Sequence, residues 1–238
     1  MPKQVAEYKL LRKYRCDRVQ NPEEVHLHYF ISIVKCGYFE CVTGVCFADT
    51  DYVVDLVEID PHKVGFISEG YAPIYESDLK ASIQGKWRQT YATASLQVAI
   101  RDTDITFTPV STLSSPDGSI NLMYVFHILE ETDDVIRGKE GFQIVIMKIT
   151  VFPETTGSHD CHILGDASSK KAGIKLRLSS SPRHLQEGTA THEFLSSERV
   201  VIRAGDPKTT NVLTDLYTSV DFQRLATSNR MAEMVIDK

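Results

Sequence analysis

A chain of 238 residues, 42% of them hydrophobic, can bury a substantial core, which excludes disorder as its overall state. Its 26 Lys and Arg against 32 Asp and Glu give a net charge of −6, which argues against a dedicated nucleic-acid binder, a class that is more often basic. No apolar run approaches the roughly 18 residues that span a bilayer, and the charged N-terminus lacks the apolar stretch of a signal peptide. We therefore expect a cytoplasmic or nuclear protein without a transmembrane segment.

The first 18 residues differ in charge from the rest of the chain. They contain six Lys or Arg and two acidic residues, a charge of +4, whereas the remainder carries −10. Apolar residues at roughly helical spacing favour a short amphipathic helix that Asn21-Pro22 would end, so the sequence predicts a basic arm over residues 1–22. The arm either folds back on the acidic body or binds an anionic partner. Its contacts would then be Lys9, Arg12, Lys13, Arg15 and Arg18.

Short strands dominate the predictions for the region that follows the arm. Runs of β-branched and aromatic residues bounded by turn residues predict four strands, at residues 25–35, 38–47, 52–60 and 63–68. Cys36-Gly37 should form a tight hairpin turn between the first two strands, because glycine tolerates a positive φ. Glu69-Gly70 should form a turn after the fourth strand.

One helix is expected within this strand-rich pattern. Ser77 is a favourable N-cap, and Leu79, Ile83 and Trp87 recur every four residues on one face. They predict a helix over residues 78–88 that packs on the sheet.

Alternating or continuously apolar runs predict further strands in the rest of the chain. These strands lie at residues 91–101, 105–113, 120–129, 142–152, 174–180 and 198–207. The polar, Gly- and Ser-rich stretch at 153–172 is typical of a linker or long loop. In the tail, Leu213, Leu216, Tyr217 and Val220 fit one face of a helix.

Together these elements predict a mainly β fold. We expect an antiparallel β-sandwich or barrel of about nine strands, with one or two helices and a basic N-terminal arm. The predicted organisation is the arm at 1–22, a main β domain at 23–152, a linker at 153–172, and C-terminal strands and a helix at 173–238 that belong to the same domain.

Several signatures of enzymes and nucleotide-binding proteins are absent from the sequence. It contains no phosphate loop GxxxxGK[ST], no GxGxxG after a predicted strand, no HExxH and no GxSxG. These absences weaken the hypothesis of an enzyme, and we assign no cofactor.

Two histidine motifs have simpler interpretations than metal sites. His26 and His28 would lie opposite Phe47 and Val45 in the predicted hairpin, so a third ligand is missing. The run at 159–162, His-Asp-Cys-His, lacks a second ligand pair elsewhere and is typical of a polar loop. We assign no metal.

The cysteines and the acidic run after them also favour structural roles. Odd spacing on the predicted strand would send neighbouring cysteines to opposite faces, so Cys36, Cys41 and Cys46 should be reduced thiols buried as small apolar side chains. The acidic segment at 49–60 lacks the glycine of a calcium loop, which predicts a solvated turn followed by a strand.

A second basic stretch supports the hypothesis of an anionic partner. Residues 167–186 include no acidic residue. The candidate contacts in this stretch are Lys170, Lys171, Lys175 and Arg177. With the arm, they favour a non-enzymatic β-rich structural or interaction protein that docks on RNA or an anionic membrane surface and is able to self-associate. Viral matrix, coat and movement-type proteins combine such features, by fold-level analogy alone, and no small-molecule substrate is identified.

Two alternatives stay open at this point. One is a metal-assisted hydrolase whose site is assembled from distant strands and uses His26 and His28 with a carboxylate. The other is a ligand-carrying β-barrel. Metal analysis and extraction of bound small molecules would separate these alternatives.

Overall fold

The structure of the protein is a computed structural model. It describes residues 29–50, 52–76, 90–108, 113–114, 120–121, 130–132, 134–139, 143–147, 176–180, 185–195, 199–204, 207–217 and 223–226. The strands are β1 (Phe30–Val34), β2 (Val53–Val57), β3 (Thr90–Thr93), β4 (Ile105–Thr108), β5 (Leu113–Ser114), β6 (Ile120–Asn121), β7 (Gln143–Met147), β8 (Leu176–Ser180), β9 (Arg199–Ala204) and β10 (Gln223–Ala226). The helices are α2 (Tyr38–Asp49), α3 (Pro61–Ser68), α5 (Leu96–Asp102), α9 (Ala190–Leu195) and α10 (Pro207–Leu216).

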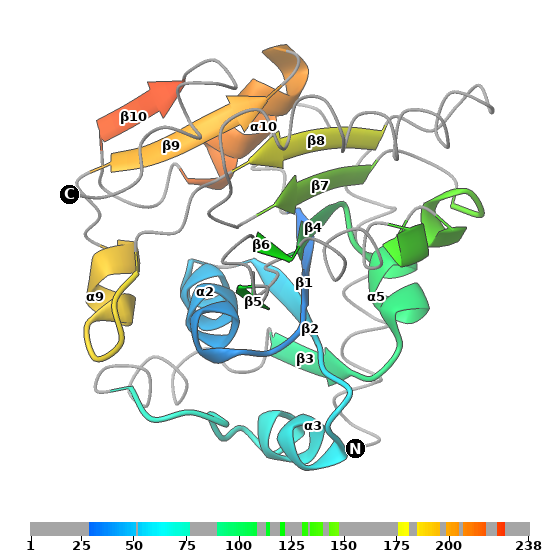
Figure 1. The fold of residues 1–238 in the computed structure, drawn as a ribbon, viewed down its shortest axis with the longest axis vertical. Coiled ribbons are helices and arrows are strands. Elements are labelled where there is room, and N and C mark those ends of the chain that lie inside the picture. The colour runs from blue at the N-terminus through cyan, green and yellow to red at the C-terminus, as the bar shows by residue number, and fades with distance from the viewer. Residues whose placement is uncertain are drawn as a thin grey trace, which may run out of the picture.

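One sheet organises most of these strands, in the order β10-β9-β8-β7-β4-β1-β2-β3 (Figure 1). Every pairing from β3 to β8 is parallel, whereas β9 runs antiparallel to β8. The parallel strands follow the order 3-2-1-4-5-6 of doubly wound Rossmann folds. The predicted antiparallel sandwich or barrel is therefore wrong, and the protein has a Rossmann-like α/β fold.

Helices cover both faces of the sheet, as parallel strands require (Figure 1). On β1, Ile31 and Ile33 belong to the core on the α2 side. Ser32, between them, points to the opposite face, where its hydroxyl lies 2.9 Å from the Thr103 hydroxyl at the end of α5. Because both faces are covered, β1 and β2 are buried along their whole length.

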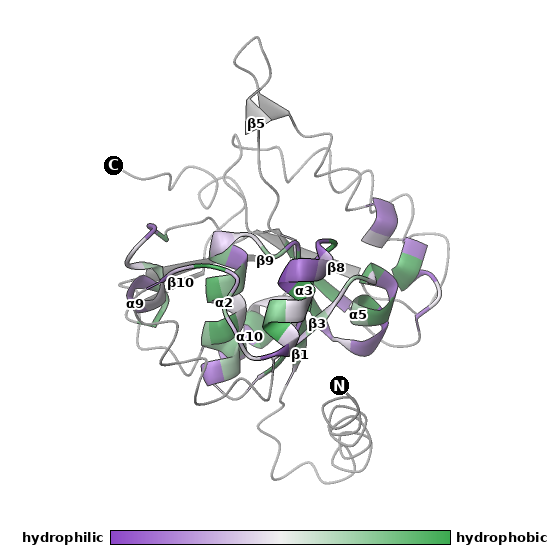
Figure 2. Ribbon diagram, turned by 90° about the horizontal axis from the view of Figure 1, so that it is seen from below, coloured by the Kyte–Doolittle hydropathy of each residue, from purple (hydrophilic) through white to green (hydrophobic). Residues whose placement is uncertain are grey.

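Helix α2 replaces the strand that we predicted over residues 38–47. All its residues from Glu40 to Ala48 are buried, and Figure 2 shows it in the hydrophobic colour over most of its length. A helix that is apolar on all sides is a buried helix, and its sequence lacks the one-sided periodicity that identifies surface helices. Cys36-Gly37 accordingly connects a strand to a helix, and the predicted hairpin is wrong.

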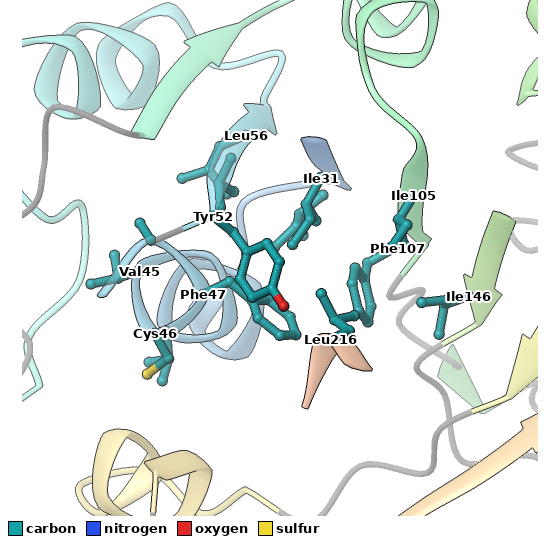
Figure 3. Packing of buried hydrophobic residues seen from close by; sticks show 14 of the residues in the cluster. Ile31, Val45, Cys46, Phe47, Tyr52, Leu56, Ile105, Phe107, Ile146 and Leu216 are labelled. Carbon is teal, nitrogen blue, oxygen red and sulfur yellow. The ribbon is translucent and has the colours of Figure 1, made fainter. Parts of the chain in front are cut away.

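The core is centred on Phe47, near the end of α2 (Figure 3). Its ring centroid lies 5.3 Å from that of Phe107 on β4 and 5.1 Å from that of Phe194 on α9. Tyr217, directly after α10, lies 5.5 Å away. Elements from both ends of the described chain therefore share one core.

Helix α3 also replaces a predicted strand, at 63–68. Asp60 is its N-cap and accepts a hydrogen bond from the His62 backbone N–H at 2.9 Å, and Pro61 takes the first helical position. Asp-Pro is a helix-start signal, which we interpreted as the end of a strand. The predicted strand at 91–101 is right only for β3, because the chain turns at Ser95 into α5.

Other predicted elements are confirmed. Strands β2, β7, β8 and β9 lie within predicted strands, and Glu69-Gly70 forms a turn with a positive φ of 88° at Gly70. The tail helix is confirmed for α10, with Leu213, Leu216 and Tyr217 buried, but strand β10 in the same tail was not predicted, and Val220 lies outside the described residues.

The arm at 1–22, the helix at 78–88 and the linker at 153–172 lie outside the described residues, so the predicted domain boundaries stay predictions. Among the helices that the structure describes, none combines the length and apolar character needed to cross a membrane.

Candidate functional site

The strand order changes direction at β1. From β1 the chain builds one side of the sheet through β2 and β3, then returns to add β4 on the other side of β1. Ligands of open α/β sheets bind at such a point, beyond the carboxyl ends of the strands. The turn from β1 into α2 and the end of β2 therefore form the candidate site.

The turn itself has the backbone of a phosphate-binding turn. Lys35 has a φ of +67°, and among the described residues it is the only non-glycine with a positive φ. Gly37 is the N-cap of α2 and carries no side chain to cap the helix. The positive end of the helix dipole favours an anion there.

Glu58 follows β2 at the same edge of the sheet and is buried, with 6% of its surface exposed. Its Oε1 accepts a hydrogen bond from the Asp60 backbone N–H at 3.1 Å. Its Oε2 lies 3.3 Å from Lys63 Nζ, and this ammonium also donates to the Cys36 carbonyl at 3.3 Å. Lys63 of α3 thus ties Glu58 to the β1–α2 turn.

These positions correspond to those of a dinucleotide site. An acidic residue about 20 positions after the turn binds the ribose in Rossmann domains, and Glu58 stands at that distance from Gly37. The usual GxGxxG turn has the form KxGxxE here, from Lys35 through Gly37 to Glu40. We excluded a nucleotide-binding turn because only one of its glycines is present.

The fit to a dinucleotide therefore differs between the two halves of the site. Glu58 and the bare Gly37 suit the ribose and the close approach of a pyrophosphate. Glu40 does not suit the pyrophosphate, because its carboxylate lies over Gly37: a β-carbon on Gly37 would overlap Oε2 of Glu40 and lie 3.3 Å from its Cδ. Sequence reasoning missed one signal of this site. That signal is a strand followed by a turn with one glycine, a helix and a later acidic residue.

A second buried carboxylate fixes the start of α2 to two distant segments. Glu76 is 4% exposed, and its Oε2 accepts hydrogen bonds from the Tyr38 hydroxyl and, at 3.1 Å, from the Gly188 backbone N–H. Its Oε1 accepts from the Thr191 N–H at 3.5 Å. We call Tyr38, Glu76, Gly188 and Thr191 the Glu76 clamp. It holds the segment before α9 beside the candidate site.

The predicted role of the cysteines is confirmed for the three that the structure describes. Cys36, Cys41 and Cys46 are buried and not disulfide-bonded. A hydrogen bond with Cys36, together with burial, raises the pKa of the Cys41 thiol well above its usual value. Cys41 is therefore a neutral packing residue beneath the turn and not a nucleophile.

Most of the residues that the sequence suggested for binding lie outside the described part of the chain. This holds for the basic arm, for Lys170, Lys171 and Lys175, and for His26 and His28. Arg177 lies on β8, away from the β1–α2 turn in strand order. No group of three or more His, Cys, Asp or Glu within the described ranges is placed to hold a metal ion. Asp55 and Glu58 of the acidic segment at 49–60 are buried, on β2 and directly after it, within the strand that we predicted at 52–60.

Comparison with known proteins identifies relatives of this domain. The model of the UDP-glucose/GDP-mannose dehydrogenase family, NAD binding domain, matches residues 29–221. A GDP-mannose 6-dehydrogenase of Pseudomonas aeruginosa is 30% identical over 208 residues, which are 86% of this chain and 48% of that protein. A UDP-glucose 6-dehydrogenase of Haloferax volcanii is 30% identical over 187 residues, 79% of this chain and 44% of that protein.

A solved structure agrees with these matches. The UDP-glucose dehydrogenase of Pyrobaculum islandicum has a TM-score of 0.82 and 30% identity, over 90% of this chain and 49% of that one. The chain thus spans about half the length of the relatives it matches.

These matches correct the predicted function. The non-enzymatic protein docking on RNA or an anionic membrane is wrong, because the matched relatives are dehydrogenases. The predicted partner, RNA or an anionic membrane with no small-molecule substrate identified, is corrected as well, because the relatives are named for nucleotide sugars. The open sheet also rules out the alternative of a ligand-carrying barrel.

Proposed function

We propose that this chain, which belongs to the UDP-glucose/GDP-mannose dehydrogenase family, is the cofactor-side domain of an oxidoreductase that oxidises the sugar of a nucleotide sugar with NAD. In such a reaction NAD accepts the hydride, and the protein supplies binding and orientation. The match to about half of each relative concerns this cofactor side, so the sugar substrate and the complete reaction belong to the proposal.

The observation that carries the proposal is the position of Glu58. It stands at the carboxyl end of β2, beside the turn that leads from β1 into α2, and Lys63 links it to that turn at 3.3 Å. A carboxylate there accepts hydrogen bonds from a ribose 2′-hydroxyl, whereas it repels a 2′-phosphate. This geometry favours NAD over NADP.

Calorimetric titration of the purified chain tests the proposal. We expect NAD⁺ to bind more tightly than NADP⁺, and Glu58→Ala to abolish binding of NAD⁺. Glu69→Ala is the matched control, because Glu69 is exposed at the end of α3. Equal binding of NAD⁺ by wild type and Glu58→Ala would contradict this assignment.

Activity tests the substrate class. Formation of NADH should be followed with UDP-glucose and with GDP-mannose, the sugars named in the relatives. Dependence on either sugar supports the proposed reaction, and NADH formation that is independent of both would contradict it.

A further inference from the structure

A side chain of the protein itself lies beside Gly37 in the β1–α2 turn. In Rossmann turns the second glycine is bare so that the pyrophosphate can approach the backbone. Gly37 meets that requirement, but the carboxylate of Glu40 lies against its Cα, where any β-carbon would overlap Oε2.

Glu40 is buried in this position. It belongs to the first turn of α2, a helix of 12 residues, and only 7% of its surface is exposed. A negative charge at a helix N-terminus is stabilised by the helix dipole, which is the interaction that a phosphate would otherwise receive. The carboxylate therefore has both the place and the electrostatic role of a bound phosphate.

We infer that Glu40 is an internal competitor for the pyrophosphate of the cofactor, so that the domain binds a dinucleotide only after this carboxylate has moved away from Gly37. The inference rests on the proposed function and adds a residue that sets cofactor affinity. The ribose side of the site is formed by other residues, Glu58 at the end of β2 and Lys63 on α3.

The expected change in cofactor affinity depends on the fraction of molecules in which the Glu40 carboxylate has moved away from Gly37. Apparent affinity falls by the fraction of molecules in which the site is competent, so a site open in about one molecule in ten binds about tenfold more weakly. A ligand without phosphates does not need the space above Gly37 and should be insensitive to Glu40.

Titration of the full chain with NAD⁺, ADP and adenosine provides the test. Glu40→Gly restores the glycine of the GxGxxG pattern, and Glu40→Ala removes the carboxylate while keeping a good helix former. Both variants should bind NAD⁺ and ADP at least about tenfold more tightly than wild type. Their affinity for adenosine should change by less than about twofold. Glu69→Ala, remote from the turn, should behave as wild type. Circular dichroism checks that each variant is folded.

The outcomes separate this inference from the proposed function. If wild type binds NAD⁺ as tightly as both Glu40 variants, and Glu58→Ala still abolishes that binding, the inference is overturned and the proposed function stands. If no protein in the series, including Glu40→Gly, binds NAD⁺ or ADP, both fail. Equal gains for adenosine and for ADP would also overturn the inference, because Glu40 would then not act on the phosphate side.

Discussion

At Gly44, α2 packs directly on β1 and β2. A β-carbon at this position would lie 2.7 Å from Leu56 Cδ2 and 3.3 Å from Ile33 Cδ1. Both of these side chains are fully buried, so they have little room to move aside. The last glycine of GxGxxG usually permits such close packing of helix and strand. Since Glu40 stands at that position here, the close approach occurs one turn later, at Gly44.

Gly44→Val should therefore destabilise the protein by about 1–3 kcal/mol, the usual cost of overpacking a core. The matched control is Gly65→Val in α3, where a β-carbon would have no neighbour within 4 Å. That control should change the free energy of unfolding by less than about 0.5 kcal/mol, because valine and glycine differ little in helix propensity. Chemical denaturation measures both values. Equal losses in the two variants would show that Gly44 does not limit the packing of α2.

Single residues were predictable where their type alone determines their role. The burial of Cys36, Cys41 and Cys46 follows from their small apolar side chains, and the structure confirms it. The burial of Glu58 did not follow from its type, because a carboxylate is usually exposed unless it is paired. Its partner, Lys63, belongs to a helix that we predicted as a strand, so the pairing could not be anticipated.

At the scale of elements, strands were predicted better than helices. Strands β2, β7, β8 and β9 are short apolar runs that end at turn residues, which local composition reveals. Helix α2 has the same composition, because it is buried on all sides, and a buried helix and a buried strand of similar length lack a distinguishing period. The misassigned α2 also removed the βαβ pattern from which a parallel sheet could have been predicted.

The Glu76 clamp connects α2, the segment that ends at Glu76 and the start of α9, so its loss should act on a whole segment. Glu76→Ala removes the acceptor of the Tyr38 hydroxyl and of the Thr191 N–H, and it removes one of the two acceptors of the Gly188 N–H, which also donates to the Tyr38 hydroxyl at 2.9 Å. We expect a loss of about 1–2 kcal/mol in the free energy of unfolding, because the N–H of Thr191 is buried and a buried donor without an acceptor is costly. Hydrogen exchange should accelerate at Gly188 and Thr191 in this variant and not in Glu69→Ala. Unchanged exchange at both amides would contradict the role of the clamp.

At the scale of the molecule, topology depends on contacts between distant parts of the sequence. Phe47 on α2 packs against Phe107, Phe194 and Tyr217, which follow it by 60, 147 and 170 residues. Tyr52, directly before β2, donates a hydrogen bond from its hydroxyl to the Asp215 carbonyl of α10 at 3.3 Å. Such contacts decide which strands become neighbours, and no local pattern in the sequence records them. This is why the sequence predicted the positions of several strands but not their order in the sheet.

Tyr52 also makes the stability of the whole molecule sensitive to alkaline pH. Burial is the largest cause that raises the pKa of Tyr52 from 10.0 to about 12, and the nearby Tyr29 and Asp215 contribute to this rise. Above pH 10 the unfolded chain loses this proton and the folded chain keeps it, so stability is complete below pH 10 and falls as pH rises towards 12. Thermal unfolding should show this fall, and Tyr52→Phe should reduce the slope of stability against pH by up to about 1.4 kcal/mol per pH unit.

At neutral pH, Tyr52→Phe should lower the free energy of unfolding by about 1 kcal/mol, because the hydrogen bond of the hydroxyl is lost. Tyr75→Phe is the control, since Tyr75 is 91% exposed, and it should keep the wild-type slope. An alkaline slope that is identical in wild type and Tyr52→Phe would contradict the assignment to Tyr52.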